Sequence, residues 1–319
     1  MTGHVHFLRR EGDVNHRLLF VALLAAAACP ASGAGAQVSL PPVNLGDSSF
    51  LDGVGGPGWL FQETVSYYSA DWFRDGDGDR VSIPSEVTAA AAVTHIAYLS
   101  DVKLFGGYWG AELLLPVAHV DLGIGAGVDG AGTGVGDLVV SPFILQWTDD
   151  TLFGKPFWHR LNLNVTLPTG RYDSNNIVNP GDNSFRFNPH YAVTWQVSPK
   201  WELSGRLHYL WVSENDDPPQ YLAARSTQAG QAIHANYSVS REVADGLRIG
   251  LSGYFLRQIT DDRVDDAVVA NSREQVLGLG PGLRWQRGAS TLFANGYVET
   301  AAKDRPEGVR LSLRYARVF

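Results

Sequence analysis

Three aspartates at every second position of the stretch DWFRDGDGDR raise the question of a calcium site. Calcium loops of the EF-hand type take oxygen ligands from positions one, three and five and from a glutamate at position twelve. Asp75, Asp77, Asp79 and Glu86 meet that spacing. Position six, however, is Arg80 instead of the glycine that makes the sharp turn, and the proline in VSIPSE prevents the helix that should follow. These four residues are a weak calcium candidate, and we expect neither a metal centre nor a cofactor.

A second set of candidate residues is charged and lies in three consecutive segments in which polar and apolar residues alternate. Their polar face carries Arg160, Arg186, His190, Glu202, Arg206 and His208. A basic strip next to water repels cations and attracts anionic or polarised aromatic solutes, on which Trp158 of the same face could stack. We therefore expect these residues to line the path of a small-molecule solute. The alternative is that the charges pair with one another and fill a narrow lumen.

The elements that position these residues are long strands. The stretches FWHRLNLNVTLPTG, FRFNPHYAVTWQVS and WELSGRLHYLW each alternate with a period of two. Runs of about 10 to 13 residues cross a bilayer when tilted, whereas strands of soluble proteins average about 5 to 6. The same pattern predicts twelve strands, near 59–69, 87–99, 108–120, 136–147, 157–168, 185–197, 201–212, 228–241, 247–259, 274–286, 291–301 and 308–319.

The connections between these strands alternate between long polar loops and short turns such as SPK and EVADG. Long loops outside the cell and short turns in the periplasm are typical of outer-membrane proteins. The predicted fold is therefore all-β, a single-chain antiparallel transmembrane β-barrel of about 12 strands over residues 59–319. The last strand ends in Phe319 and looks like the signal read by the barrel-assembly machinery. We expect a monomer in outer-membrane lipid.

The N-terminus reads as an export signal, which places the protein in the outer membrane of a Gram-negative cell. Residues 1–36 contain arginines, the apolar run LLFVALLAAAA and small residues before the cleavage point. Residues 37–58 would follow as a periplasmic segment. A lipoprotein alternative uses Cys29, but no large aliphatic residue precedes it.

Composition excludes several classes of function. Cys29 is the single cysteine and leaves with the signal, so disulfides, thiolate catalysis and cysteine-bound zinc are excluded. The formal charge is −8 and no basic run is present, so we expect no nucleic-acid partner.

Motifs in order along nearly the whole mature chain carry a family resemblance. They are YYSADWFRDGDGDR (67–80), GVGDLVVSPFILQW (134–147), LPTGRYD (167–173), NPG with the following Asn183, GYFLRQITDD (253–262) and GLGPGLRW (278–285). Together they resemble the outer-membrane family linked to the meta-pathway of phenol degradation. The resemblance implies a barrel encoded among genes for the breakdown of aromatic or other hydrophobic compounds, with a role in their passage. It implies no catalytic residues, and it makes the Asp/Gly stretch an extracellular loop.

Three classes of function compete. We favour a channel or conduit for small molecules, with a closed structural barrel around a charged plug as the alternative. A lipid-modifying barrel enzyme would need a serine and a histidine facing lipid near the outer rim, oriented by a third polar group. Ser69 and His119 approach that region but lie two strands apart and have no evident orienting partner. We therefore expect no enzyme.

Overall fold

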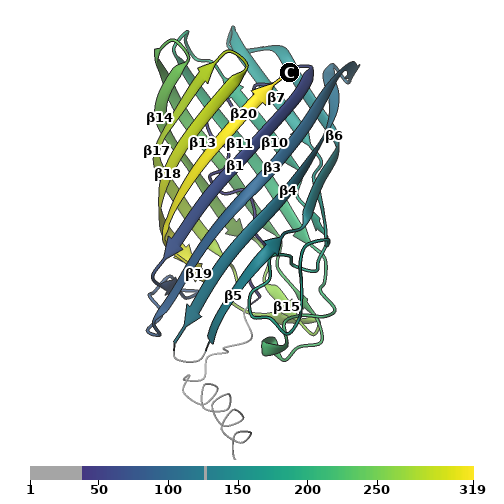
Figure 1. Ribbon diagram of the computed structural model, residues 1–319, viewed down its shortest axis with the longest axis vertical. Coiled ribbons are helices and arrows are strands. Elements are labelled where there is room, and N and C mark those ends of the chain that lie inside the picture. Colours follow the sequence, from purple (N-terminus) through teal and green to yellow (C-terminus); the bar gives the residue numbers. More distant parts are fainter. Residues whose placement is uncertain (1–37, 126–127) are drawn as a thin grey trace, which may run out of the picture. The chain divides into compact units, whose positions relative to one another are not determined.

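The structure is a computed structural model, and it describes residues 38–125 and 128–319. The predicted signal peptide, residues 1–36, lies outside the described residues. The described chain forms a closed antiparallel barrel of twelve strands, which confirms the predicted fold class (Figure 1). Within these ranges the single helical element is a 3-10 turn at Gln220–Leu222, so the described residues contain no helix long and apolar enough to cross a membrane.

Nine barrel strands are continuous in the described chain. They are β1 (Gly58–Ala70), β3 (Ser85–Leu104), β4 (Gly107–Ile124), β11 (Trp201–Val212), β13 (Ala232–Ala244), β14 (Leu247–Gln258), β17 (Gln275–Arg287), β18 (Ser290–Lys303) and β20 (Val309–Val318). The other three are interrupted, each by two residues. They are β5 (Val128–Val135) with β6 (Leu138–Leu152), β7 (Lys155–Asn162) with β8 (Val165–Leu167), and β9 (Arg186–Phe187) with β10 (His190–Trp195).

The barrel closes where the last strand pairs with the first. β20 and β1 pair in register from Leu60 opposite Val318 to Ser69 opposite Val309. The N–H of Phe319 donates to the carbonyl of Trp59 at 2.9 Å, so the C-terminal residue takes part in the closure. Closure satisfies the backbone groups that an open sheet edge would leave without partners in lipid.

Side chains alternate between an apolar outer face and a polar inner face, as the period of two predicted. On β20, Leu311 and Leu313 are exposed, whereas Ser312 and Arg314 between and beside them are buried. Exposed aromatic side chains gather near both ends of the barrel: Trp59, Tyr98, Trp201, Trp285 and Phe319 near one end, and Tyr67, Phe185, Phe187, Tyr209 and Trp211 near the other. Such girdles mark the two interfaces of a membrane. The outward-facing Glu63 accepts a hydrogen bond from the Thr94 hydroxyl at 2.8 Å.

The two ends of the barrel differ in their connections. The end at the top of Figure 1, here the short-turn end, carries the C-terminus and connections of two to five residues at 105–106, 153–154, 196–200, 245–246 and 288–289. Phe105 and Gly106 both have positive φ, 51° and 83°, as a two-residue hairpin turn requires. The opposite end, here the long-loop end, carries 71–84, 168–185, 213–231, 259–274 and 304–308.

Small sheets stiffen the long loops. β2 (Phe73–Arg74) pairs with β19 (Arg305–Pro306). β12 (Thr227–Gln228), β15 (Asp262–Val264) and β16 (Ala267–Val269) form a three-stranded sheet.

The glycine-rich stretch 121–135 lies between two of the strands expected from sequence, 108–120 and 136–147, and in the structure it extends two paired strands. β4 continues to Ile124, and β5 pairs with it from Val117 opposite Val135 onward. The glycines of β5 let loop 168–185 pack directly against it, because a Cβ on Gly132 would lie 2.7 Å from the carbonyl oxygen of Val178. Alternating glycines hid this strand from a pattern based on side-chain hydrophobicity.

Candidate functional site: the barrel lumen

Residues 38–57, here called the inner segment, run along the inside of the barrel from one end to the other. Val38, Leu40 and Val43 pack against a buried cluster that includes Leu210 at the long-loop end. Near the short-turn end, the N–H of Gly53 donates to Thr194 Oγ1 at 2.8 Å. Residues 37–58 were expected to be a periplasmic segment ahead of the barrel, but residues 38–57 lie in the lumen.

Polar contacts anchor the inner segment to the wall formed by β10 to β18. Arg206 on β11 donates from Nε and Nη2 to the two carboxylate oxygens of Asp52, each at 2.7 Å. Asn236 on β13 accepts from the N–H of Gly46 at 2.6 Å, and the Tyr297 hydroxyl donates to the Gly46 carbonyl at 2.9 Å. The segment is therefore held at several levels along one side of the lumen.

The three arginines of the predicted basic strip do lie on consecutive strands and do face inward. Each of them, however, forms an ion pair with a carboxylate or a hydrogen bond with a backbone carbonyl. Arg186 lies 3.0 Å from Asp137 and 3.2 Å from Asp182, and Arg160 donates to the Asp52 carbonyl at 3.2 Å. In the loop, burial raises the pKa of the Asp182 carboxyl to about 6, against the opposing effect of Arg186.

Glu202 was expected to line the solute path with the arginines, and in the structure hydroxyl groups hold its carboxylate. Its carboxylate accepts from Ser204 and Ser240, and it is fully buried near the short-turn end. No ion pair joins it to an arginine in the described chain. The side chains chosen from sequence thus share a wall, but most of their charge is already compensated.

The two predicted histidines belong to a ladder of three. His190, His208 and His234 stand opposite one another on β10, β11 and β13, with ring centroids 4.7 Å and 4.1 Å apart. Asn188 Oδ1 lies 3.2 Å from His208 Nδ1 and 3.3 Å from His234 Nε2, so one amide is within hydrogen-bond distance of both rings.

No described part of the chain brings three or more His, Cys, Asp or Glu together in an arrangement that could hold a metal ion. In the weak calcium candidate, Asp75 Oδ1 accepts the backbone N–H groups of Asp77 at 3.1 Å and Asp79 at 2.9 Å. This carboxylate closes a turn of the loop, and Glu86 lies apart from it on β3.

The serine and histidine considered for a lipid-modifying enzyme are not joined. His119 Nε2 lies 2.9 Å from Asp121, so the expectation that it has no orienting partner was wrong. Ser69 faces Thr88 on the intervening strand β3. Among the described residues no hydrogen bond links Ser69 to His119, so the pair forms no nucleophile and base.

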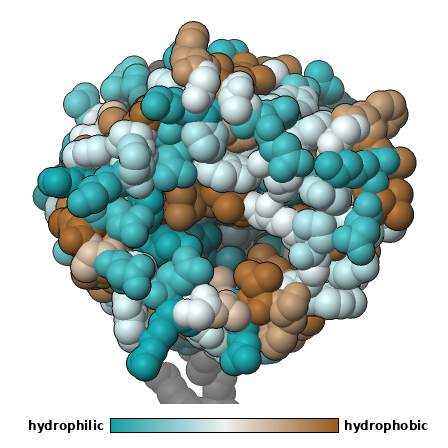
Figure 2. All heavy atoms as spheres, turned by 90° about the horizontal axis from the view of Figure 1, so that it is seen from above, coloured by the Kyte–Doolittle hydropathy of each residue, from teal (hydrophilic) through white to brown (hydrophobic). Residues whose placement is uncertain are grey.

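Between the inner segment and the opposite wall lies a cavity of about 930 Å³. Its lining includes Ala289 and Val318 at the short-turn end and Pro180 and Glu274 at the long-loop end, so one cavity reaches toward both ends. Figure 2, a view of the short-turn end, shows a hollow at the centre of the barrel. The lumen is therefore only partly filled by the inner segment.

The lining of this cavity is arranged in stripes because neighbouring strands are in register. An apolar stripe comes from alternate positions of β3 and β4, among them Ala89, Ala91, Val93, Pro116 and Ala118. A hydroxyl stripe comes from Thr64, Ser66 and Tyr68 on β1. The apolar and hydroxyl stripes thus face the open cavity, and the inner segment covers part of the wall formed by β10 to β18.

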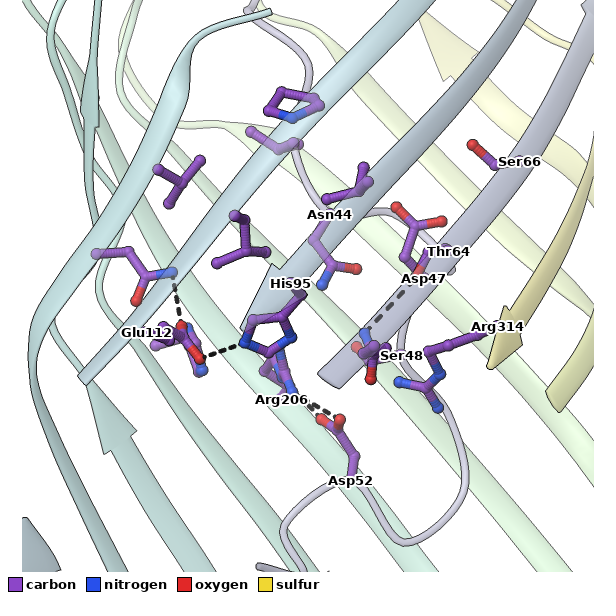
Figure 3. A pocket seen from close by; sticks show the side chains of 18 of the residues that line it. Asn44, Asp47, Ser48, Asp52, Thr64, Ser66, His95, Glu112, Arg206 and Arg314 are labelled. Atoms are coloured by element: carbon purple, nitrogen blue, oxygen red, sulfur yellow. Dashed lines mark hydrogen bonds and ion pairs between the residues drawn. The ribbon is translucent and has the colours of Figure 1, made fainter. Parts of the chain in front are cut away.

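One polar bridge crosses the apolar side. His95 Nε2 on β3 lies 3.0 Å from Glu112 on β4 (Figure 3). The other carboxylate oxygen of Glu112 accepts from Asn162 on β7 at 2.9 Å. Neither His95 nor Glu112 was among the candidate residues expected from sequence. Alternation indicates which side chains face the lumen, but no pattern in the stretch DSSFLDG indicates that it enters the barrel.

Comparison with known proteins agrees with this architecture. The family model described as "Putative MetA-pathway of phenol degradation" matches residues 70–315. This chain belongs to that family. An outer membrane channel from Pseudomonas putida F1 has the same fold, with a TM-score of 0.74 at 20% identity, covering 87% of this chain and 100% of the channel.

Other solved barrels are less similar. The β domain of the Bordetella autotransporter BrkA gives a TM-score of 0.48 at 12% identity over 83% of this chain and 100% of that domain. The translocator domain of the autotransporter NalP from Neisseria meningitidis gives 0.45 at 11% identity over 84% and 90%. No curated protein sequence matches this chain.

Proposed function

We propose that this protein is an outer-membrane channel through which small aromatic or other hydrophobic molecules reach a catabolic pathway. The observation that carries the proposal is the cavity of about 930 Å³, lined on one side by apolar side chains and reaching toward both ends of the barrel. Membership of a family described by phenol degradation supports the class of solute. A fold shared with an outer membrane channel supports the location.

The remaining expectations belong to the same proposal. Residues 1–36 would direct export, and the barrel-assembly machinery would insert the chain by its last strand. The barrel would act as a monomer in outer-membrane lipid, without a cofactor and without catalysis.

The alternative is a closed structural barrel. The anchoring of the inner segment by Asp52 and its neighbours favours this alternative, because the segment occupies part of the lumen. The two functions differ in whether a solute crosses the cavity that remains.

Replacing one small side chain that lines the cavity by a large one tests whether solutes pass through the cavity. Ala91 on β3 lines the cavity, and its neighbour Ala92 pairs with the exposed, outward-facing Val65. We expect Ala91→Trp to lower uptake of labelled phenol by intact Gram-negative cells several-fold, because the indole fills the apolar side of the cavity. Ala92→Trp is the matched control and should leave uptake unchanged.

Uptake is compared at equal amounts of folded barrel, judged by heat-modifiable migration in a gel. Equal uptake by the two variants and by cells that lack the protein would show a closed barrel, and the channel proposal would fail.

A further inference from the structure

Arg310 and Arg314 of the last strand, here called the arginine column, have no acidic side chain in contact. Arg310 and Arg314 face inward on β20 and line the cavity. Neither guanidinium forms a hydrogen bond or ion pair with another described residue, although Arg314 is only 7% exposed. Apart from the buried Nε of Arg310, their N–H groups are therefore available to a solute or to water.

Aromatic rings cover one side of each guanidinium. Arg314 lies 3.8 Å above the ring of Phe293, and Arg310 lies 5.5 Å from the ring centroid of Tyr68. A ring on one face leaves the edge of the guanidinium, where the N–H groups point, directed at the cavity. Figure 3 shows Arg314 reaching into the cavity beside Ser48, with no contact drawn to its guanidinium. Ser48 Oγ is itself buried without a hydrogen-bond partner.

The acids that face the arginine column are Asp47, Asp52 and Glu299. Asp52 already accepts two hydrogen bonds from Arg206, and Glu299 accepts from two tyrosine hydroxyls and a backbone N–H. Among the described residues, Asp47 accepts only from Ser312 Oγ, at 3.4 Å, and forms no ion pair. These carboxylates offset charge at a distance but leave the donor edges of the two arginines unoccupied.

The register of the strands places the arginine column, Arg310 and Arg314, beside the hydroxyl stripe and the apolar stripe. At one level Arg314 stands opposite Thr64, Thr64 opposite Val93, and Val93 opposite Pro116. β20 and β3 are separated by two strand spacings, about 10 Å. A long arginine side chain and a solute of one ring together bridge that distance.

We propose that Arg314 and Arg310 bind the carboxylate of an aromatic monocarboxylate in the lumen, with its ring against the apolar stripe of β3 and β4. The planar guanidinium fork fits a carboxylate through two parallel hydrogen bonds. Thr64 and Ser48 provide hydroxyl groups beside it. This inference deepens the proposed channel function and rests on it for the route by which the solute arrives.

Equilibrium binding to the purified full-length barrel in detergent tests the site without requiring transport. The probes are benzoate, benzyl alcohol, which has the ring without the charge, and acetate, which has the charge without the ring. We expect benzoate to bind at least about tenfold more tightly than either benzyl alcohol or acetate, because only benzoate can contact both the two arginines and the apolar stripe. Benzoate that binds no more tightly than benzyl alcohol overturns the proposal.

Substituting each arginine in turn shows which of them binds the benzoate carboxylate. Arg314→Gln should weaken benzoate binding about tenfold and change benzyl alcohol binding less than about twofold, because charge-assisted hydrogen bonds are lost. Arg317→Gln changes an exposed, outward-facing arginine of the same strand and should change neither. If Arg314→Gln folds poorly, the benzoate affinity of Arg310→Gln tests the same site. Unaltered benzoate affinity in both inward variants contradicts the assignment.

The outcomes separate the two proposals. Benzoate binding that depends on Arg314, in a barrel that does not increase uptake, supports the site and refutes the channel. Uptake of phenol that depends on Ala91, without benzoate binding, supports the channel and refutes the site.

Discussion

At the scale of single residues, the pair of Arg206 and Asp52 joins the inner segment to the barrel wall. The two side chains are 14% and 5% exposed and form two hydrogen bonds of 2.7 Å. Removing one member of a buried pair costs more than removing both, because the remaining charge stays desolvated. The position of the segment thus depends on a pair that is stable only when complete.

We expect Arg206→Met to lower the free energy of unfolding by about 3 kcal/mol, because Asp52 remains buried without its partner. Combining it with Asp52→Asn should recover most of the loss. Unfolding in detergent, followed by tryptophan fluorescence, measures both. Arg241→Met, at an exposed arginine of β13, is the control and should change stability by less than about 0.5 kcal/mol. A single variant as stable as the wild type would show that the pair does not hold the segment.

A second residue, Asp262, makes the stability of a loop at the long-loop end depend on pH. Asp262 of β15 is buried and accepts from the N–H of Gly230 at 2.8 Å, and burial raises the pKa of its carboxyl to about 7. An unfolded loop would ionise near pH 3.9. The folded loop therefore loses stability as the pH rises from about 4 to about 7, and stability levels off above that range.

We expect the Gly230 amide to be better protected from hydrogen exchange at pH 5 than at pH 8, after correction for the intrinsic exchange rate. Asp262→Asn removes the titrating group and should abolish this difference. A difference of the same size in the Asn variant would assign the pH dependence to another group.

At the scale of elements, the barrel wall and the inner segment are separable. Every barrel strand has its neighbours in the wall, and closure by β20 on β1 does not involve residues 38–57. The segment contributes contacts to the lumen, where it packs on Leu256 and Val276 and is hydrogen-bonded to Asn236. The wall therefore has the pairing it needs to form without it.

We expect deletion of residues 38–57 to leave a folded barrel with a larger single-channel conductance in planar bilayers. The reason is that the space in the lumen now filled by the inner segment becomes open to ions. Heat-modifiable migration in a gel reports whether the deleted form still folds. Conductance equal to that of the full chain would mean that the segment does not limit the pore.

Strands were predictable from sequence where side chains alternate without interruption. β11 has the bounds that alternation predicts, 201–212. The break between β9 and β10 falls at Asn188 and Pro189, and proline cannot donate to a ladder, yet the apolar pattern continues through it. A pattern of hydrophobicity therefore finds the strand and misses its irregularity.

At the scale of the whole molecule, alternation, loop lengths and the terminal aromatic residue were enough to predict a twelve-stranded barrel. The lumen was harder to predict, because alternation determines the face of a residue and not its partner across the barrel. Arg206 meets Asp52, which is 154 positions away in the chain. Arg314 shares its inward pattern with Arg206 and meets no acid, and only three-dimensional placement separates the two.

The path of the inner segment also determines where the two chain ends lie. An even number of strands brings Gly58 and Phe319 together at the short-turn end, but residue 38 lies at the long-loop end. The described start of the chain and its carboxyl terminus thus lie at opposite ends of the barrel. We expect the long-loop end to face the outside of the cell. A short epitope inserted ahead of residue 38 should then be accessible on the cell surface, whereas a folded domain fused there should be too wide for the lumen and keep the segment out of it.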